Sequence, residues 1–250
     1  RKVERAVSTL DQHYLDRDLA RLYDLDSGWS EDRDFYLRLP TREQCRILDI
    51  GCGTGLLADA YAARGHRVTA IDPAGAMLDV AREKPNAASV EWVEANAEGF
   101  RSDERYDLIV MSGNSMMALK DSASMRACFD TMRYHLDREG SIVFEVRNPD
   151  IDWSSQWEYD ITLRVDDAIV KQKRRFVRMA GPVMHFEFDY EFSDKTFKTR
   201  SAIRFHSKDE IVRGLGDAGL RVSSIVGGWQ RQDFDAAYSR YMIFTATHAA

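Results

Sequence analysis

Three glycines at alternate positions follow a short apolar run in the sequence. Residues 47–50 are apolar apart from Asp49, and Gly51, Gly53 and Gly55 come directly after them, before a stretch with helical spacing. Because glycine has no Cβ, such a loop can turn tightly and let its backbone approach a ligand closely. We expect a flat or charged ligand here, although a tight strand-to-helix turn without a ligand has a similar pattern.

An acidic residue ends the next apolar run of the sequence. Asp72 lies 17 residues after Gly55, where a carboxylate can accept hydrogen bonds from both ribose hydroxyls of an adenosine group. A dinucleotide-binding loop carries a glycine at the sixth position of its fingerprint, beneath the pyrophosphate, and this chain has Leu56 there. The spacing therefore favours an adenosine cofactor without a pyrophosphate over a nicotinamide or flavin dinucleotide.

Residues 48–55 resemble motif I of the class I S-adenosylmethionine-dependent methyltransferases almost residue for residue. Residues 68–78 resemble the second motif of that family, and residues 94–98 resemble the segment beside the adenine. The family usually has Asp where this chain has Asn96, whose amide oxygen can still accept a hydrogen bond from the adenine amino group. The resemblance implies that the cofactor is S-adenosyl-L-methionine and that the product is S-adenosyl-L-homocysteine.

The resemblance also implies a set of site residues. Asp49 is expected near the methionine end of the cofactor. The cofactor-binding residues are Tyr23, Asp49, Gly51, Cys52, Gly53, Gly55, Asp72, Pro73, Met77, Asn96, Ala97, Glu98 and Ser112. Asn114 and Ser115 follow the fourth strand, and Asn148 follows the fifth, so these three are candidates for substrate contacts. Asn and Ser also shape turns without any ligand, which is the alternative for Asn114 and Ser115.

Short β-branched runs alternate with helical segments from residue 46 onward, which predicts an α/β fold with a parallel sheet. The expected strands are 47–50, 68–71, 90–93, 108–111 and 141–146, and the expected helices are 56–64, 75–84 and 122–136. The resemblance extends this to a Rossmann-like methyltransferase fold, with a central, mostly parallel, seven-stranded sheet flanked by helices.

After Asn148 the spacing of the apolar residues changes to a period of two. This is clearest over residues 184–192, where every second residue is apolar or aromatic. Turn-like breaks divide residues 156–206 into about four strands, an antiparallel β insertion after strand five. The expected organisation is a helical lid over 1–40, a cofactor-binding core over 41–150, the insertion over 151–206 as a substrate or dimer cap, and a C-terminal helix with the last two core strands over 207–250. Apolar residues at helical spacing predict the lid helices over 3–25 and 32–39.

A tighter resemblance is to the bacterial small-molecule and aminosugar N-methyltransferases that carry such an insertion. It implies that Tyr23, and also Tyr14, belong to a lid in which a tyrosine contacts the cofactor. The alternative for Tyr14 is the buried aromatic side of an amphipathic helix.

Methyl transfer from a sulfonium depends mainly on aligning donor and acceptor, so it needs little acid–base chemistry. The catalytic residue is not identified by the sequence. Tyr14, Glu145, His185 and His206 are candidates for a group that accepts a proton from the acceptor. His185 is on the polar side of an alternating strand, and His206 borders a helix cap, so both also have structural interpretations.

Composition limits the partners. The 250 residues carry a formal net charge of −6, which gives no general attraction to a nucleic acid. No apolar run approaches the roughly 18 residues needed to span a membrane. Three cysteines without C-x-x-C spacing favour neither disulfides nor a metal site, and fit a cytoplasmic location.

The sequence thus predicts transfer of a methyl group from S-adenosylmethionine to the nitrogen or oxygen of a small molecule. A homodimer through the β insertion is a further expectation. Two alternatives remain open at this stage: methylation of RNA or protein, and a regulatory protein that binds the cofactor without turnover.

Overall fold

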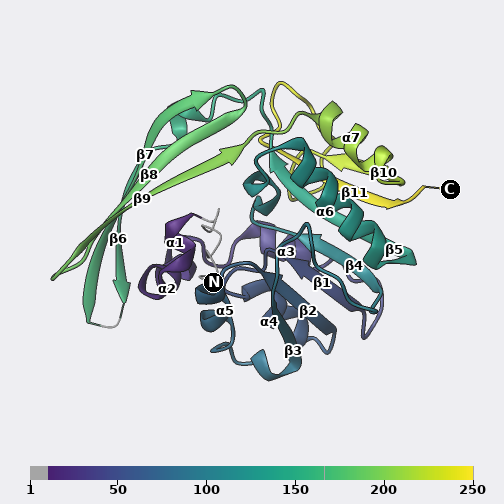
Figure 1. The fold of residues 1–250 in the computed structure, drawn as a ribbon, viewed down its shortest axis with the longest axis horizontal. Coiled ribbons are helices and arrows are strands. Elements are labelled where there is room, and N and C mark those ends of the chain that lie inside the picture. The colour runs from purple at the N-terminus through teal and green to yellow at the C-terminus, as the bar shows by residue number, and fades with distance from the viewer. Residues whose placement is uncertain (1–10, 166, 250) are drawn as a thin grey trace, which may run out of the picture.

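The structure, a computed structural model, describes residues 11–165 and 167–249 (Figure 1). Its main sheet has seven strands in the order β10-β11-β5-β4-β1-β2-β3, and only β11 runs antiparallel to its neighbours. This arrangement confirms the expected Rossmann-like fold. The strands are β1 (Arg46–Ile50), β2 (Arg67–Asp72), β3 (Val90–Glu94), β4 (Tyr106–Met111), β5 (Leu136–Arg147), β10 (Leu220–Val226) and β11 (Tyr241–His248).

Helices cover both faces of the main sheet. On one face, α3 (Glu31–Leu37) and α4 (Leu56–Ala63) bury their apolar residues against β1, β2 and β4. On the other, α6 (Ser122–His135) and α7 (Lys208–Asp217) pack against β4, β5 and β11. Helix α5 (Gly75–Ala81) joins β2 to β3, and short 3-10 turns lie at Ala87–Ser89, Ser115–Ala118 and Ser154–Gln156. No helix among the described residues is long and apolar enough to cross a membrane.

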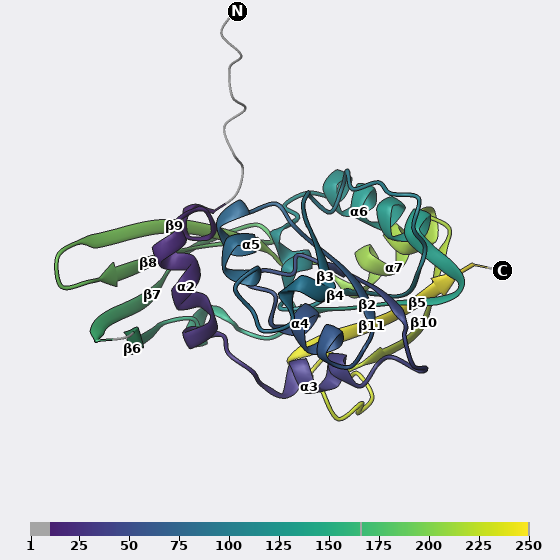
Figure 2. The same cartoon turned by 90° about the horizontal axis from the view of Figure 1, so that it is seen from below.

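The insertion forms a separate four-stranded antiparallel sheet. Its strands, in spatial order, are β6 (Tyr159–Val165), β7 (Ala168–Ala180), β8 (Val183–Glu191) and β9 (Thr196–Arg204). Along β8 the even-numbered residues from Met184 to Tyr190 are buried and the odd-numbered ones are less so, as the period of two predicts. The sheet extends away from the main sheet at the side where the first helices lie (Figures 1 and 2).

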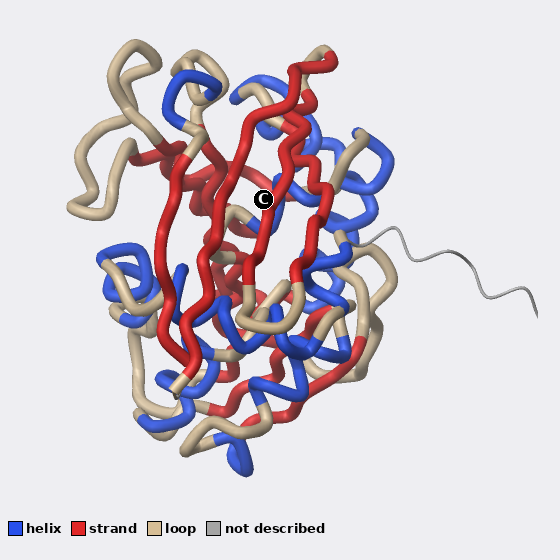
Figure 3. The backbone as a smooth tube through the Cα atoms, turned by 90° about the vertical axis from the view of Figure 1, so that its left-hand side faces the viewer, coloured by secondary structure: helices blue, strands red, loops and turns tan. Residues whose placement is uncertain are grey.

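Two N-terminal helices, α1 (Gln12–Leu15) and α2 (Arg17–Asp26), contact both α5 and the insertion sheet (Figure 3). Asp16 caps α2, because its carboxylate accepts hydrogen bonds from the backbone N–H groups of Asp18 and Leu19. The part of the expected first helix over residues 3–10 lies outside the described residues.

Strand β5 begins at Leu136, earlier than the expected residue 141. It follows α6 without a break and pairs with Tyr106 of β4. Gly140 permits this approach, since a Cβ there would lie 2.8 Å from the Tyr106 carbonyl oxygen. The local sequence 137–139 is charged and suggests a turn, and the pairing partner that makes it a strand is distant in sequence.

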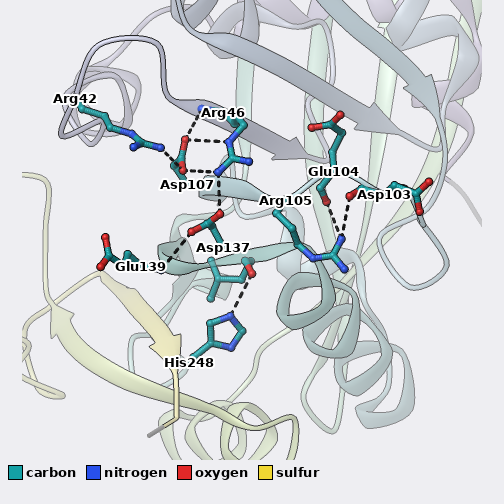
Figure 4. Close-up of polar contacts among 10 residues, drawn as sticks. Arg42, Arg46, Asp103, Glu104, Arg105, Asp107, Asp137, Glu139 and His248 are labelled. Atoms are coloured by element: carbon teal, nitrogen blue, oxygen red, sulfur yellow. Dashed lines mark hydrogen bonds and ion pairs between the residues drawn. The ribbon is translucent and has the colours of Figure 1, made fainter.

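An ionic cluster ties the strands together at the edge of the sheet where β1 and β4 begin (Figure 4). The Arg46 guanidinium bridges Asp107 at 2.9 Å and Asp137 at 2.8 Å, and Arg42 also pairs with Asp107. Partial burial would raise the pKa of Asp107, but its hydrogen bonds from Arg46 and Arg42 hold it well below its usual range. This cluster is structural, because ligands of such sheets bind at the opposite edge, where the parallel strands end.

Candidate functional site

The glycine loop connects β1 to α4 at the carboxyl edge of the sheet. Gly51, Gly53 and Gly55 have φ angles of +68°, +55° and +78°, a region that side chains with a Cβ rarely adopt. The backbone N–H groups of Gly51 and Cys52 donate to the carbonyl of Ile71, at 2.8 and 3.1 Å, which fixes the loop against the end of β2.

Gly55 has a second reason to be glycine. A Cβ there would lie 2.5 Å from the Trp92 ring and 2.9 Å from Ala81, whereas a Cβ at Gly53 would lie 3.4 Å from Met77. We expect Gly55→Ala to lower the free energy of unfolding by about 3 kcal/mol, from left-handed strain plus overpacking. Gly53→Ala should cost only about 1 kcal/mol, because the strain acts alone. Urea unfolding measures both, and equal losses would contradict the packing explanation.

Asp72 ends β2 beside the glycine loop. Its carboxylate accepts hydrogen bonds from the backbone N–H groups of Gly53 at 2.9 Å and Ala74 at 2.8 Å, and 7% of the residue is exposed. These two bonds fix the carboxylate and leave it lone pairs for two further donors. The arrangement fits recognition of a ribose diol, as the sequence predicts. Pro73, next in the chain, is partly exposed beside it.

Asp49 is the second acid at this edge. It is 1% exposed, and neither carboxylate oxygen has a hydrogen-bond partner among the described residues. Burial, with the nearby charge of Asp72, raises the pKa of Asp49 to about 7, and the charge of Arg33 opposes the rise. A buried carboxylate without a donor is costly, so its position fits a cationic group supplied by a ligand, such as the ammonium of a bound methionine moiety.

The segment expected beside the adenine lies after β3. Asn96 is exposed, and its amide oxygen accepts a hydrogen bond from the backbone N–H of Gly99 at 2.8 Å. Ala97 is buried and Glu98 is half-buried. Since the Asn96 side chain shapes its own turn, backbone groups of this segment are the better placed contacts for an adenine ring.

The lid helices are attached to the glycine loop. Asp24 of α2 accepts a hydrogen bond from the Thr54 hydroxyl and pairs with Lys84 at 2.5 Å. Tyr14 and Tyr23 lie with ring centroids 6.3 Å apart and pack near Met77 of α5. Both expected lid tyrosines therefore lie together beside the cofactor loop.

Arg33 is a residue that the sequence analysis missed. It lies in α3, its side chain is only 13% exposed, and it donates to the Gly28 carbonyl at 2.8 Å and pairs with Asp32 at 3.5 Å. Burial raises the pKa values of Asp49 and Tyr23, and the positive charge of Arg33 opposes the rise in both, so Arg33 lies near the site. The sequence gives only a weak signal for Arg33, which is the one basic residue among the acidic residues 31–34.

The loop after β4 faces the glycine loop. Ser115 donates its hydroxyl to the carbonyl of Ser112 at 2.6 Å, and also lies 3.3 Å from the Gly51 carbonyl. Asn114 has a φ of 59°, and its amide oxygen is buried without a hydrogen-bond partner in the described part of the chain. A cavity of about 340 Å³ lies here, lined by Ser30, Glu31, Asp32, Asn114, Glu145, Trp229 and Tyr241.

Glu145 of β5 holds the loop after β4 in place. Its carboxylate accepts hydrogen bonds from the Asn114 backbone N–H at 2.6 Å and from the Tyr36 hydroxyl, and the residue is 0% exposed. Burial raises the pKa of Glu145 to about 7, although both hydrogen bonds lower it. Both partners fix the carboxylate, so Glu145 positions Asn114 and α3 while also lining the cavity.

Asn148 corrects an expectation. It is 0% exposed, and its side-chain amide donates to the carbonyls of Ala236 at 2.9 Å and Ser239 at 2.8 Å, while its amide oxygen accepts from the Asp150 N–H. No surface or free donor remains for a substrate. Asn148 instead ties the end of β5 to the loop that precedes β11.

The two histidine candidates lie in different surroundings. His185 is on the face of β8 opposite to the buried Phe186 and Phe188, so it points away from the core. His206 is 0% exposed, its Nδ1 lies 3.8 Å from Glu210, and burial lowers its pKa. Neither is placed to take a proton from a ligand at the cofactor loop, because one faces outward and the other is enclosed.

Comparison with known proteins identifies the central segment. Residues 47–140 match the family described as a methyltransferase domain. The cypemycin N-terminal methyltransferase of a Streptomyces species is 30% identical over 103 residues, which are 41% of this chain and 42% of that protein. The match thus spans less than half the length of this curated relative.

Two solved structures share the fold over nearly the whole chain. The CcbJ methyltransferase from Streptomyces caelestis has a TM-score of 0.77 at 22% identity, covering 95% of this chain and 98% of the other. CalS10, an amino pentose methyltransferase from Micromonospora echinaspora, has a TM-score of 0.68 at 22% identity, covering 98% and 100%. Residues 47–140 therefore match the model of a methyltransferase domain, and the chain shares the Rossmann-like fold of these solved methyltransferases.

Proposed function

We propose that this protein is an enzyme that transfers a methyl group from S-adenosyl-L-methionine to a nitrogen or oxygen of a small molecule. The observation that carries the proposal is the pair of acids around the glycine loop. Asp72 is aligned by two backbone donors, and Asp49 is buried with no donor among the described residues. Together they fit a cofactor that presents a ribose diol to one acid and an ammonium to the other.

Each part of the site has a role in this function. Asp72 and the glycine loop would hold the adenosine, Asp49 and Arg33 would face the charged methionine end, and the backbone after β3 would face the adenine. When bound, the cofactor supplies a methyl group on a sulfonium, whose positive charge disappears during transfer. The protein then has mainly to align the acceptor and to exclude water, which the lid tyrosines Tyr14 and Tyr23 are placed to do.

Several observations favour a small acceptor. The similar structures include an amino pentose methyltransferase, and a small cavity lies beside the loop after β4. The net charge of −6 gives no general attraction to RNA. In the proposed organisation, residues 1–40 form a lid. Residues 151–206 form a cap over the acceptor or a dimer contact, and this segment exposes Ile169, Val177 and Met179.

Calorimetric titration with S-adenosylmethionine and with NAD tests the cofactor assignment. We expect saturable binding of the first at micromolar concentration and none of the second. Binding of NAD alone would overturn the proposal. Incubation with pools of small metabolites, followed by measurement of S-adenosylhomocysteine release, then tests turnover. Cofactor binding with no release from any pool would favour a regulatory protein.

A further inference from the structure

Three arginines surround two tryptophans just beyond β5. The guanidinium of Arg147 lies 5.2 Å from the ring centre of Trp153 and 5.1 Å from that of Trp157. Arg240 lies 4.5 Å from the Trp153 ring, and Arg174 lies 4.2 Å from the Trp157 ring. The three cations come from β5, β7 and the loop before β11, so the tertiary fold has gathered them at one place. We call these five residues the Arg–Trp cluster.

None of the three arginines has a carboxylate within 4.0 Å among the described residues. This is unusual in a chain whose acids outnumber its basic residues, 41 to 35, and whose other buried guanidiniums, such as Arg33 and Arg204, are paired. The Nε atom of Arg147 is buried without a hydrogen-bond partner in the described part of the chain.

The charges of Arg147 and Arg174 also act against each other. Burial lowers the pKa of Arg174, and the charge of Arg147 lowers it further. Two acids oppose these shifts: Asp26 acts on Arg174, and Glu145 acts on Arg147. Asp26 is already engaged by the Tyr159 hydroxyl at 2.8 Å and the Gln172 amide at 2.9 Å, and Glu145 by the Tyr36 hydroxyl and the Asn114 backbone N–H. Aromatic faces stabilise cations only in part, so the cluster retains positive charge that no carboxylate of the described residues contacts directly.

The cluster is held in place by its surroundings. Arg174 donates from Nε to the Trp157 carbonyl at 2.7 Å, and Arg240 donates to the Gln156 amide oxygen at 2.8 Å. The Trp153 indole N–H donates to the carbonyl of Asn148 at 2.8 Å. Trp153 and Trp157 are 6% and 3% exposed, so the rings form a packed support on which the guanidiniums are oriented in advance.

The position of the cluster relates it to the acceptor side of the site. Arg147 is the last residue of β5, at the carboxyl edge of the sheet, where this type of fold places ligands. It lies next to Met117, in the loop after β4, and pairs across the sheet with Tyr241, which lines the cavity beside Asn114. Arg147 is partly exposed there, and Arg240 is exposed at the rim.

We propose that the Arg–Trp cluster binds an oxyanion, a carboxylate or phosphate, carried by the methyl acceptor. The planar guanidinium of Arg147 matches such a group through paired hydrogen bonds, and the tryptophans hold that guanidinium in position. This inference rests on the proposed methyl transfer only for the statement that the ligand is the methyl acceptor. The anion site itself is inferred from the arginines that have no carboxylate partner.

The test is calorimetric titration of the protein saturated with S-adenosylhomocysteine, using pyrophosphate in one series and succinate in another. We expect saturable binding of at least one of them, and the tighter one tells whether the acceptor group is phosphate or carboxylate. Arg147→Gln should weaken it about 30-fold, and Arg147→Lys should weaken it less, because charge remains while the paired hydrogen bonds are lost.

Two further variants keep the test decisive. Arg175→Gln removes the same charge from the neighbouring position of β7, where Arg175 pairs with Asp160 at 2.5 Å, and should leave anion binding unchanged. Arg240→Gln changes an exposed side chain, so it should fold normally and still weaken binding, even if Arg147→Gln does not fold.

The inference would be overturned if neither anion bound to the wild-type protein. It would also be overturned if Arg147→Gln and Arg240→Gln bound the anion as tightly as the wild type does. The arginines would then only support the tryptophans. Failure of S-adenosylhomocysteine to bind would instead count against the proposed function, and titration of the cofactor-free protein would still test the anion site.

Discussion

Replacing Asp72 with alanine is expected to weaken S-adenosylmethionine binding by about 100-fold. The variant removes the proposed acceptor of two charge-assisted hydrogen bonds from the ribose hydroxyls, each expected to contribute about 1.5 kcal/mol. It also frees the backbone N–H groups of Gly53 and Ala74, which Asp72 holds at 2.9 and 2.8 Å, so the loop loses its preorganised shape. Calorimetric titration with S-adenosylmethionine measures the change.

Asp79→Ala is the matched control for this variant. Asp79 lies nearby on α5, but its side chain is 52% exposed and pairs only with Arg82 at 3.2 Å. Its loss should leave cofactor affinity within twofold of wild type. An Asp72→Ala protein that binds the cofactor as tightly as the Asp79→Ala protein would show that the ribose lies elsewhere.

Replacing Asp49 with asparagine is expected to have opposite effects on binding and on stability. The variant removes the negative charge proposed to face the cofactor ammonium, so affinity for S-adenosylmethionine should fall by about tenfold, as for loss of one charge-assisted contact. The cofactor-free protein should become more stable at alkaline pH, because the wild type then holds a buried carboxylate without a donor.

The pH dependence follows from the raised pKa of Asp49, about 7 in the folded protein against the ordinary value of 3.8. Below pH 4 the carboxyl is protonated in both states, and its contribution to stability is fully present. As the pH rises toward 7 the unfolded chain ionises while the folded one resists, so this contribution is lost. Three pKa units correspond to about 4 kcal/mol at pH 8, an order-of-magnitude figure.

Urea unfolding at pH 4.5 and pH 8 checks this expectation. Wild type and Asp49→Asn should have similar stability at the lower pH, and the variant should be the more stable at the higher one. Cofactor binding to the wild type should also release a proton near neutral pH, seen by calorimetry in buffers of different ionisation enthalpy. A variant less stable than wild type at pH 8 would mean that Asp49 has a donor in the folded protein.

Local sequence determined much of this protein. The loop Gly51-x-Gly53-x-Gly55 after an apolar strand, and the acid at the end of the following strand, predicted the cofactor side of the site, since their geometry depends on backbone conformations within about 25 residues. The change of period after Asn148 predicted the second sheet, because a period of two is a property of each strand by itself.

Tertiary structure decided which polar side chains remain free to meet a ligand. Asn148 looked available, but partners 88 and 91 residues away occupy its amide, while His206 became enclosed. The Asp49 carboxylate and the Nε of Arg147, in contrast, lack a hydrogen-bond partner in the described part of the chain. Whether a buried polar group is satisfied depends on contacts between distant segments, and spacing along the chain does not contain them. The sequence alone therefore indicated the methyl donor, and only the folded chain brings together the arginines for which we propose an anionic group on the acceptor.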